Sequence, residues 1–306
     1  MGRRKKGDKI DGWLVIDKPR DMGSTDVVNK TRRLFNAQKN GHTGTLDPFA
    51  TGVLPIAFGE ATKLVPYVTD GPKEYEFIIQ WGAETATGDT EGEVVSRSDK
   101  IPSSEEILAV LPLFIGQITQ VPPAYSAIKI GGQRAYDLVR KGEEVNIPER
   151  IVEIYYLELM EELPNRQAKF KVGCSKGTYV RTLGMDIARK LGTKGYLAEL
   201  RRTKCGNFDL SDTILLENLE NMVHSKGSKE ILLPVITSLR DIAEIAVTEA
   251  DAAKLKQGQA ISPRNYPVTD LQGKMVAAMF EGELAAMVRI EETRISPHRV
   301  FNFNEN

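Results

Sequence analysis

The sequence predicts a mixed α/β (α+β) protein in which a large N-terminal domain is followed by a small C-terminal β domain. Its 306 residues exceed the roughly 100 to 200 residues of a single domain. Apolar runs of strand length are interspersed with segments whose apolar residues recur at helical spacing. The pattern changes near residue 245, where a short helical segment precedes two strand-like runs. With 41% hydrophobic and 27% charged residues, the chain has the composition of a folded globular protein.

The first third of the chain is predicted to place strands and one helix around a shaped loop. Ser24 and Thr25 are candidate N-caps for a helix whose apolar residues recur at helical spacing. Residues 41–52 hold three Gly, three Thr and one Pro, a composition typical of neither a regular helix nor a strand. We therefore expect a loop there. Two apolar runs are strand-like, at residues 12–16 and 75–81, and the loop leads into a further apolar run at 53–58.

The middle of the chain is predicted to contain a functional loop and an insertion. Residues 82–92 are rich in Gly, Thr and Asp, and loops of this length usually have a function. Ser103 or Ser104 caps a short helix. Regular structure then breaks at two prolines, and a basic helix is expected at residues 134–141, so that about 120–150 forms an insertion. Strands at 151–160 and 168–174 and a helix that carries Leu183, Ile187 and Leu191 complete this region.

The last part of the chain predicts a separate small domain. A helix is expected from residue 248 to 257, ended by Gly258. The runs at 275–280 and 283–290 flank a Glu-Gly turn and predict a β-hairpin. The acidic stretch 211–245 is the expected connector.

The net charge of -1 conceals an uneven distribution of charge. Residues 1–10 carry five basic groups against one acid and are expected to be flexible. Residues 161–210 carry eleven basic groups against five acids, interleaved with aromatic and glycine residues. Such a block suits a polyanion, although a solvated charged surface would have the same composition. Charge alone therefore does not identify nucleic acid as the partner.

Several classes of protein are disfavoured by what the sequence lacks. No run approaches the roughly 18 apolar residues of a membrane span, and the basic N-terminus is not followed by an apolar region, so we expect a cytoplasmic protein without membrane contact. Two cysteines and three widely separated histidines suggest neither a disulfide framework nor a zinc site. Phosphate-loop, serine-hydrolase, zinc-protease and dinucleotide motifs are missing. We expect no metal and no cofactor.

Asp47 and His42 are the candidate reactive residues of the 41–52 loop. Asp47 precedes Pro48, which fixes the local geometry, and the neighbouring glycines let the backbone approach a ligand closely. An Asp in such a loop also commonly forms a local turn, and a single His is commonly an ordinary surface or core residue. Both interpretations stay open from these residues alone.

Tyr179 and Arg181 form a second candidate cluster. They are two residues apart, so on a strand their side chains would share one face. An Arg opposite a carboxylate keeps it ionised and fixes its geometry, and an aromatic ring beside it offers a stacking surface for a base. The alternative is a strand with an ordinary surface Arg.

Longer blocks of sequence resemble one enzyme family. Residues 41–56 and 59–63 are similar to the active-site block of the bacterial tRNA pseudouridine(55) synthases of the TruB type. The C-terminal hairpin region is similar to that family's small PUA-like domain. Two positions depart from its pattern, Asp21 where the family usually has Gly and Gly23 where it usually has Thr, which questions the shape of this turn. Further blocks follow in the family's order, at residues 73–75, 120–129, 174–181 and 200–203.

The resemblance implies a pseudouridine synthase fold with a mixed, largely antiparallel sheet. By it, residues 11–245 form the catalytic domain, about 120–150 an insertion that grips RNA, and 246–306 a PUA-like RNA-binding domain. The implied reaction converts uridine 55 in the T loop of tRNA to pseudouridine after the base is flipped out of the RNA. The implied partner is tRNA, and we expect a monomer.

The resemblance also implies roles for individual residues. Asp47 would be the nucleophile and Arg181 its partner, while Tyr75 would cover the flipped uracil and is a candidate for proton transfer. Tyr179 and Leu200 would shape the pocket. Outside these, His42 would pack against the vacated RNA loop, and Lys18 and Lys63 would be structural or contact phosphate.

Two other interpretations share much of this sequence pattern. An RNA-binding or tRNA-folding protein with an idle synthase site would have the same basic residues and C-terminal domain. The intact Asp47, Tyr75 and Arg181 argue against it. A guide-RNA-dependent synthase of the archaeal and eukaryotic type has a related core, but its C-terminal region differs from the one here.

Overall fold

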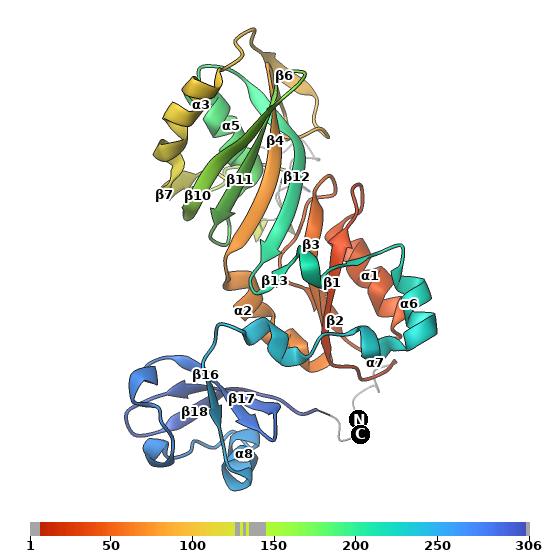
Figure 1. Cartoon of the computed structure of the whole chain (residues 1–306), viewed down its shortest axis with the longest axis vertical. Coiled ribbons are helices and arrows are strands. Elements are labelled where there is room, and N and C mark those ends of the chain that lie inside the picture. The colour runs from red at the N-terminus through yellow and green to blue at the C-terminus, as the bar shows by residue number, and fades with distance from the viewer. Residues whose placement is uncertain (1–6, 126–128, 131–132, 135–144, 304–306) are drawn as a thin grey trace.

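A mixed sheet of ten strands forms the body of the protein (Figure 1). The computed structural model describes residues 7–125, 129–130, 133–134 and 145–303. The main strand order is β14-β1-β3-β12-β4-β11-β10-β7, with β2 beside β3 and β13 beside β12. Only the pairs β1 with β14 and β3 with β12 are parallel, so the expected largely antiparallel sheet is confirmed. The strands are β1 (Gly12–Lys18), β2 (Asn40–His42), β3 (Thr51–Phe58), β4 (Lys73–Trp81), β7 (Gly116–Gln120), β10 (Arg150–Leu163), β11 (Gln167–Cys174), β12 (Gly195–Cys205), β13 (Phe208–Asp209) and β14 (Ile214–Leu215).

The two halves of this sheet meet along a narrow seam. Strand β12 runs antiparallel to β4 over most of its length, but it pairs with β3 only at Arg201 with Thr51 and Arg202 with Gly52. Gly52 has φ +101°, and a Cβ there would lie 2.2 Å from the carbonyl oxygen of Arg202. Only glycine permits this approach of β3 to β12. The loop at residues 41–52, which carries Asp47, therefore ends at the seam.

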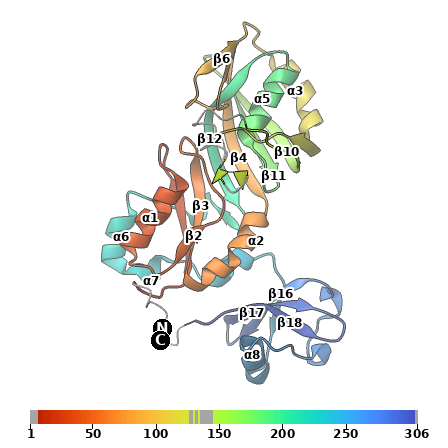
Figure 2. The same cartoon turned by 180° about the vertical axis from the view of Figure 1, so that it is seen from behind.

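Helices cover one face of the upper half of the sheet (Figure 2). Helix α5 (Val180–Lys190) buries Leu183 and Ile187 against the sheet, as their spacing predicts. Helix α3 (Ser104–Val110) begins at Ser103, whose hydroxyl and the Glu106 carboxylate form a capping box. Shorter β5 (Ala83–Thr85) and β6 (Val94–Arg97) form a hairpin where only a loop was expected.

The lower half holds the first helix and the connector. Helix α1 (Ser24–Leu34) has Gly23 at its N-cap, which corrects the expected caps. The Ser24 hydroxyl is occupied elsewhere, because it both donates to and accepts from the backbone of Leu46 at 2.8 Å. Helix α2 (Val65–Asp70) follows β3. The expected connector contains α6 (Leu219–Lys226) and α7 (Ser228–Ile231).

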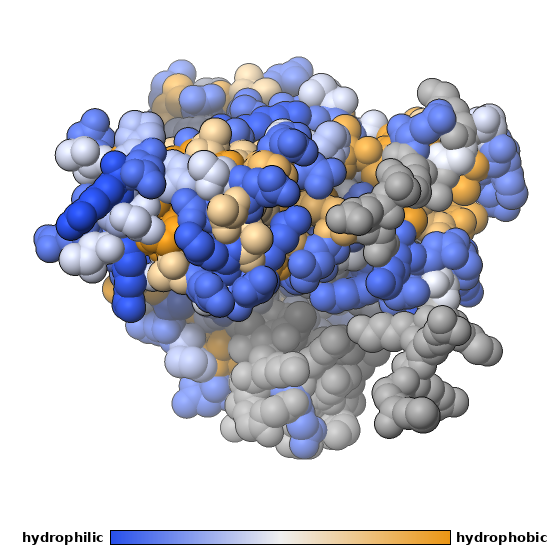
Figure 3. All heavy atoms as spheres, turned by 90° about the horizontal axis from the view of Figure 1, so that it is seen from below, coloured by the Kyte–Doolittle hydropathy of each residue, from blue (hydrophilic) through white to orange (hydrophobic). Residues whose placement is uncertain are grey.

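A small four-stranded sheet lies below the main sheet and packs on it through apolar side chains. Trp13 and Phe208 of the main sheet belong to the same buried cluster as Met287 and Phe301 of the small domain. Trp13 Nε1 donates to the carbonyl of Val235 at 3.0 Å. The predicted hairpin is confirmed as β16 (Met275–Phe280) and β17 (Glu283–Ile290). Seen from below, the surface mixes hydrophilic with hydrophobic residues (Figure 3). The elements, in the order β15-β16-β17-β18, are β15 (Glu244–Ala246), β16 (Met275–Phe280), β17 (Glu283–Ile290) and β18 (Ile295–Val300), with α8 (Glu249–Lys256) beside them.

Two expected elements, the flexible N-terminal tail and the basic helix, lie partly outside the residues that the structure describes. Residues 1–6 of the expected flexible tail lie outside them, whereas Asp8 N donates to the carbonyl of Asn36 at 2.6 Å and Ile10 is buried. Of the expected basic helix at 134–141, only Arg134 is described, in β9 (Gln133–Arg134). Among the described residues, no helix is long and apolar enough to cross a membrane.

Candidate active site

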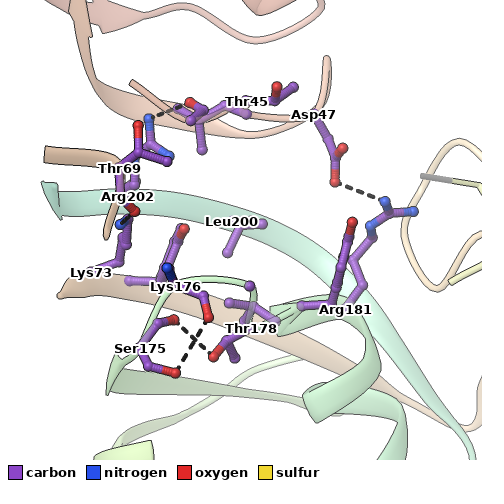
Figure 4. Close-up of a pocket in the computed structure, with 16 residues that line it drawn as sticks. Thr45, Asp47, Thr69, Lys73, Ser175, Lys176, Thr178, Arg181, Leu200 and Arg202 are labelled. Atoms are coloured by element: carbon purple, nitrogen blue, oxygen red, sulfur yellow. Dashed lines mark hydrogen bonds and ion pairs between the residues drawn. The ribbon is translucent and has the colours of Figure 1, made fainter. Parts of the chain in front are cut away.

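A pocket of about 320 Å³ opens between the two halves of the main sheet (Figure 4). Its floor comes from β4 and β12. Its walls come from the loop between β2 and β3 and from the loop that leads from β11 into α5. Asp47 and Arg181 point toward each other at one end, and Thr69 and Lys73 lie at the other. The polar and aromatic residues that line it include Thr45, Asp47, Thr69, Lys73, Tyr75, Ser175, Lys176, Thr178, Tyr179, Arg181 and Arg202.

The loop that carries Asp47 is held on both sides of this residue. Before it, the backbone of Leu46 makes two hydrogen bonds with the Ser24 hydroxyl. After it, the carbonyl of Pro48 accepts from Lys18 Nζ at 3.1 Å. These hydrogen bonds hold the backbone on both sides of Asp47 at the edge of the pocket.

Lys18 and Lys63 are both structural residues in this fold. Lys18 has no exposed surface, and its Nζ also donates to the carbonyls of Pro19 at 2.8 Å and Met22 at 2.7 Å. Burial lowers the pKa of Lys18 to about 8, and the negative charge of Asp47 opposes this. Lys63 Nζ contacts the Glu60 carboxylate at 2.6 Å and the carbonyl of Val300 at 2.8 Å, which ties the two sheets together.

One guanidinium connects Asp47 to a second carboxylate. Arg181 Nη2 lies 2.9 Å from Asp47 Oδ2, and Nη1 lies 3.2 Å from Asp89 Oδ2. The same two nitrogens donate to the carbonyls of Tyr125 at 2.9 Å and Thr87 at 2.8 Å. Asp89 is buried and is itself held by the Thr87 hydroxyl at 2.5 Å. The Arg181 head group is therefore fixed from several directions.

Asp47 combines a held oxygen with a free one. Among the described residues, only Oδ2 has a hydrogen-bond partner, so Oδ1 can approach a ligand. Burial by the pocket walls raises the pKa of Asp47, the Arg181 charge lowers it, and the Asp89 charge raises it again. A third of the side chain stays exposed to the pocket. A fixed carboxylate with one free oxygen can act as a nucleophile or stabilise a developing positive charge.

Tyr75 lies on the pocket floor beside a buried arginine. It is the cross-strand partner of Arg202, and the two side chains are hydrogen bonded. Arg202 Nε also donates to the carbonyl of Val53 at 2.8 Å. Burial raises the pKa of the Tyr75 hydroxyl far above its usual range, so this group stays protonated at neutral pH. Tyr75 can donate a hydrogen bond and stack, but it is not a base at neutral pH.

The structure corrects the expected strand at Tyr179 and Arg181. The chain leaves β11 at Cys174 and turns at Gly177, which has φ +83°. Tyr179 is then the N-cap of α5, and Arg181 lies in its first turn. Both still line one pocket because the helix begins at its edge. Local turn geometry, rather than strand alternation, brings them together.

Of the other expected site residues, Leu200 lines the pocket and His42 does not. Leu200 is buried on β12. His42 is half-buried at the end of β2, opposite Ile56. Burial lowers the pKa of its imidazole, and its Nδ1 has no partner among the described residues. His42 is therefore a neutral side chain beside the site.

Sequence reasoning gave no role to Asp89, Arg202 or Lys73. Asp89 lies in the 82–92 loop, whose composition indicated a function but not which residue carried it. Arg202 belongs to a block that resembles the family, but a buried arginine has no pattern of its own. Lys73 caps α2, because its Nζ donates to the carbonyls of Val68, Thr69 and Gly71.

Comparison with known proteins identifies the family. A curated tRNA pseudouridine synthase B from Caulobacter vibrioides is 47% identical over 98% of this chain and 99% of that protein. The chain belongs to the TruB family. The model of the TruB family pseudouridylate synthase (N terminal domain) matches residues 32–180, and that of the tRNA pseudouridylate synthase B C-terminal domain matches residues 181–255. A tRNA pseudouridine synthase B from Bradyrhizobium diazoefficiens is 48% identical over 98% of this chain and 88% of that protein.

Solved structures confirm the pseudouridine synthase fold of this TruB-family chain. The structure of a Cbf5-Nop10-Gar1 complex matches with a TM-score of 0.74 at 25% identity, over 94% of this chain and 84% of that one. An H/ACA RNP bound to a substrate RNA containing 2'-deoxyuridine matches with a TM-score of 0.74 at 22% identity. That match covers 99% of this chain and 92% of the other. At this identity it supports the fold alone.

Proposed function

We propose that this pseudouridine synthase converts uridine 55 in the T loop of tRNA to pseudouridine, with Asp47 as the nucleophile. The observation that carries the proposal is the Asp47 carboxylate, held by Arg181 at 2.9 Å with its other oxygen free at the pocket. The relatives named tRNA pseudouridine synthase B support tRNA as the substrate.

The chemistry needs a fixed anion and room to turn the base. The bond from C1' to N1 breaks, the uracil rotates, and C1' bonds to C5, while the proton on C5 is lost and N1 gains one. The reaction is an isomerisation with no net oxidation or reduction. Asp47 Oδ1 supplies the anionic oxygen, whether it bonds to the base, bonds to the sugar, or assists an elimination. Arg181 keeps this carboxylate ionised and in place.

A base stacked within RNA cannot reach this pocket, so the uridine must be flipped out. Flipping costs a few kcal/mol, which stacking and hydrogen bonds inside the pocket offset. We assign Tyr75 to cover the uracil from the floor, with Tyr179 and Leu200 as the walls. His42 does not line the pocket, and we assign it to packing against the RNA loop from which the base has been flipped.

The C-terminal sheet offers a basic surface for the rest of the RNA. Arg289 and Arg299 are exposed and lie close enough to Tyr67 of α2 to lower its pKa. Among the described residues neither arginine has an ion-pair partner. Thr69 of the same helix lines the catalytic pocket. We therefore propose residues 246–306 as an RNA-binding domain next to the catalytic domain at 11–245, with the insertion at about 120–150 as a second contact.

The proposed site needs no residue from a second copy of the chain, and we propose a monomer. The test is to incubate the protein with an unmodified tRNA transcript, without guide RNA, and to map pseudouridine. Conversion at position 55 is expected for the wild type and none for Asp47→Asn. Tight binding without conversion would instead favour an RNA-binding protein with an idle site, and conversion only with added guide RNA would favour the guide-dependent type.

A further inference from the structure

Gln120, at the start of the insertion, is hydrogen bonded to Tyr179, the residue at which α5 begins. It is the last residue of β7 and is buried. Tyr179 N donates to Gln120 Oε1 at 3.0 Å, and Gln120 Nε2 donates to the carbonyl of Tyr179 at 3.3 Å. Tyr179 has extended backbone angles, φ -99° and ψ 107°. The amide therefore pairs with it as a neighbouring strand would.

Arg150, at the end of the insertion, contacts the same tyrosine through its ring. Gln120 and Arg150 are direct partners across β7 and β10. The guanidinium of Arg150 lies 5.0 Å from the centroid of the Tyr179 ring, and its Nη1 donates to the carbonyl of Gly177 at 3.3 Å. Both ends of the insertion thus hold Tyr179, one by its backbone and one by its side chain.

Two further hydrogen bonds run between the same segments. Thr182 Oγ1 donates to the carbonyl of Val121 at 3.5 Å, and Arg181 Nη2 donates to the carbonyl of Tyr125 at 2.9 Å. Residues 120–125 and 179–182 are therefore tied at three places. The nitrogen that contacts Tyr125 is also the one that contacts Asp47.

We propose that Gln120 is a positioning residue for the isomerisation, because its amide fixes the backbone at the start of α5 and thereby orients Arg181 against Asp47. The inference rests on the proposed function. Arg181 follows Tyr179 by two residues, so a displaced helix start displaces its guanidinium. A misplacement of about 1 Å at a catalytic group can lower a rate by about 100-fold.

The chemistry of the amide explains why this position suits glutamine. Tyr179 presents one N–H, which needs an acceptor, and one carbonyl, which accepts from Leu183 N at 3.0 Å and has a second lone pair for another donor. Glutamate has the same shape but supplies acceptors only, so Gln120→Glu keeps one bond and sets an oxygen against the Tyr179 carbonyl. Asparagine is neutral but one methylene shorter and cannot reach both groups.

The experiment compares Gln120→Glu with wild type on a tRNA transcript. We expect the single-turnover rate at saturating RNA to fall at least about tenfold, with the Kd for tRNA within about threefold. The acid limb of the rate should move to higher pH in Gln120→Glu and also in Gln120→Asn, which adds no charge of its own, because a displaced Arg181 no longer lowers the pKa of Asp47. The other charged groups that act on Asp47, Asp89 and Lys18, are unchanged in this variant. Gln117→Glu is the matched control, since Gln117 is exposed on the same strand.

The outcomes separate this inference from the proposed function. A wild type that makes no pseudouridine refutes the proposed function itself. The positioning role is overturned if the wild type is active and Gln120→Glu has the same rate and pH profile. It is also overturned if a lower melting temperature is the only change in Gln120→Glu. Should Gln120→Glu not fold, Gln120→Asn is measured in its place with the same expected loss. If neither folds, Gln120 is a purely structural residue and the inference is wrong.

Discussion

Asp47 and Asp89 share one guanidinium, with Arg181 between them. Asp47 is 2.9 Å from one terminal nitrogen and Asp89 is 3.2 Å from the other. Asp89 has almost no exposed surface and does not line the pocket. It can therefore act on Asp47 through Arg181 and through its own charge, but it does not reach a ligand in the pocket.

Asp89→Asn should lower activity without removing the nucleophile. The amide keeps the size of the side chain but loses the charge that balances Arg181, and weakening a buried ion pair costs up to about 3 kcal/mol of stability. We expect single-turnover rates to fall about 10- to 100-fold, with tRNA binding unchanged. Glu91→Gln, which changes a less buried acid of the same loop, is the control. Equal losses in both variants would mean that the loop, not Asp89, matters.

Asp47→Asn should abolish the reaction and spare binding. An amide cannot supply the anionic oxygen, and loss of such a group typically costs several orders of magnitude in rate. Binding depends mainly on phosphate contacts, so a filter-binding Kd near the wild-type value is expected. Turnover within about tenfold of wild type would remove Asp47 from the mechanism.

The difference in stability between Asp47→Asn and wild type should be larger at neutral pH than at acid pH. The pKa of Asp47 is raised in the folded protein above 3.8, so the ionised form costs stability at neutral pH, and this cost disappears as the pH falls through the folded pKa. Asp47→Asn should thus be at least as stable as wild type at pH 7, and this difference in stability should vanish by about pH 4. Urea unfolding at several pH values measures this. A variant clearly less stable at pH 7 would show that the Arg181 attraction outweighs burial.

Asp21→Gly should stabilise the protein. Asp21 has φ +63°, which lies in the left-handed region that favours glycine. The left-handed conformation costs an L-residue about 1 to 2 kcal/mol, and the greater freedom of glycine in the unfolded chain offsets part of the gain. We expect a net gain of about 0.5 kcal/mol by urea unfolding. Asp26→Gly, the same change inside α1, should instead destabilise by about 1 kcal/mol.

The double variant Arg289→Gln with Arg299→Gln should weaken tRNA binding and flatten its salt dependence. Each arginine that contacts a phosphate contributes roughly one to the slope of log affinity against log salt, so the slope should fall by about two. Arg294→Gln is the control, because Arg294 is paired with Glu291. An unchanged slope would show that RNA does not contact this surface.

Much of the fold followed from local patterns, whereas pairings across the chain did not. The strands β1, β4, β10 and β11, the apolar stripe of α5 and the C-terminal hairpin were predicted, and β3 was noted only as an apolar run. Strand β12 was missed, because Arg201, Arg202 and Lys204 interrupt its apolar alternation, although Arg202 is buried. The predicted strand at Tyr179 was wrong because Gly177 turns the chain.

The candidate site was predicted in its residues more than in its geometry. Asp47, Tyr75, Arg181, Tyr179 and Leu200 line one pocket, and resemblance to the family rather than periodicity predicted that they belong to one site. The contact of Asp89 with Arg181 joins residues far apart in the chain, and no spacing rule reveals such a pair.

The seam at Gly52 has a consequence for how activity is lost. Asp47 belongs to the half of the sheet that contains β3, and Arg181 belongs to the half that contains α5, while only two residue pairs join β3 to β12. One buried apolar cluster spans both halves, with Ile56 of β3 and Phe77 of β4 among its members, so this shared core keeps the carboxylate against the guanidinium although the strand pairing at the seam is short. On heating, activity should therefore be lost together with the melting of this shared core.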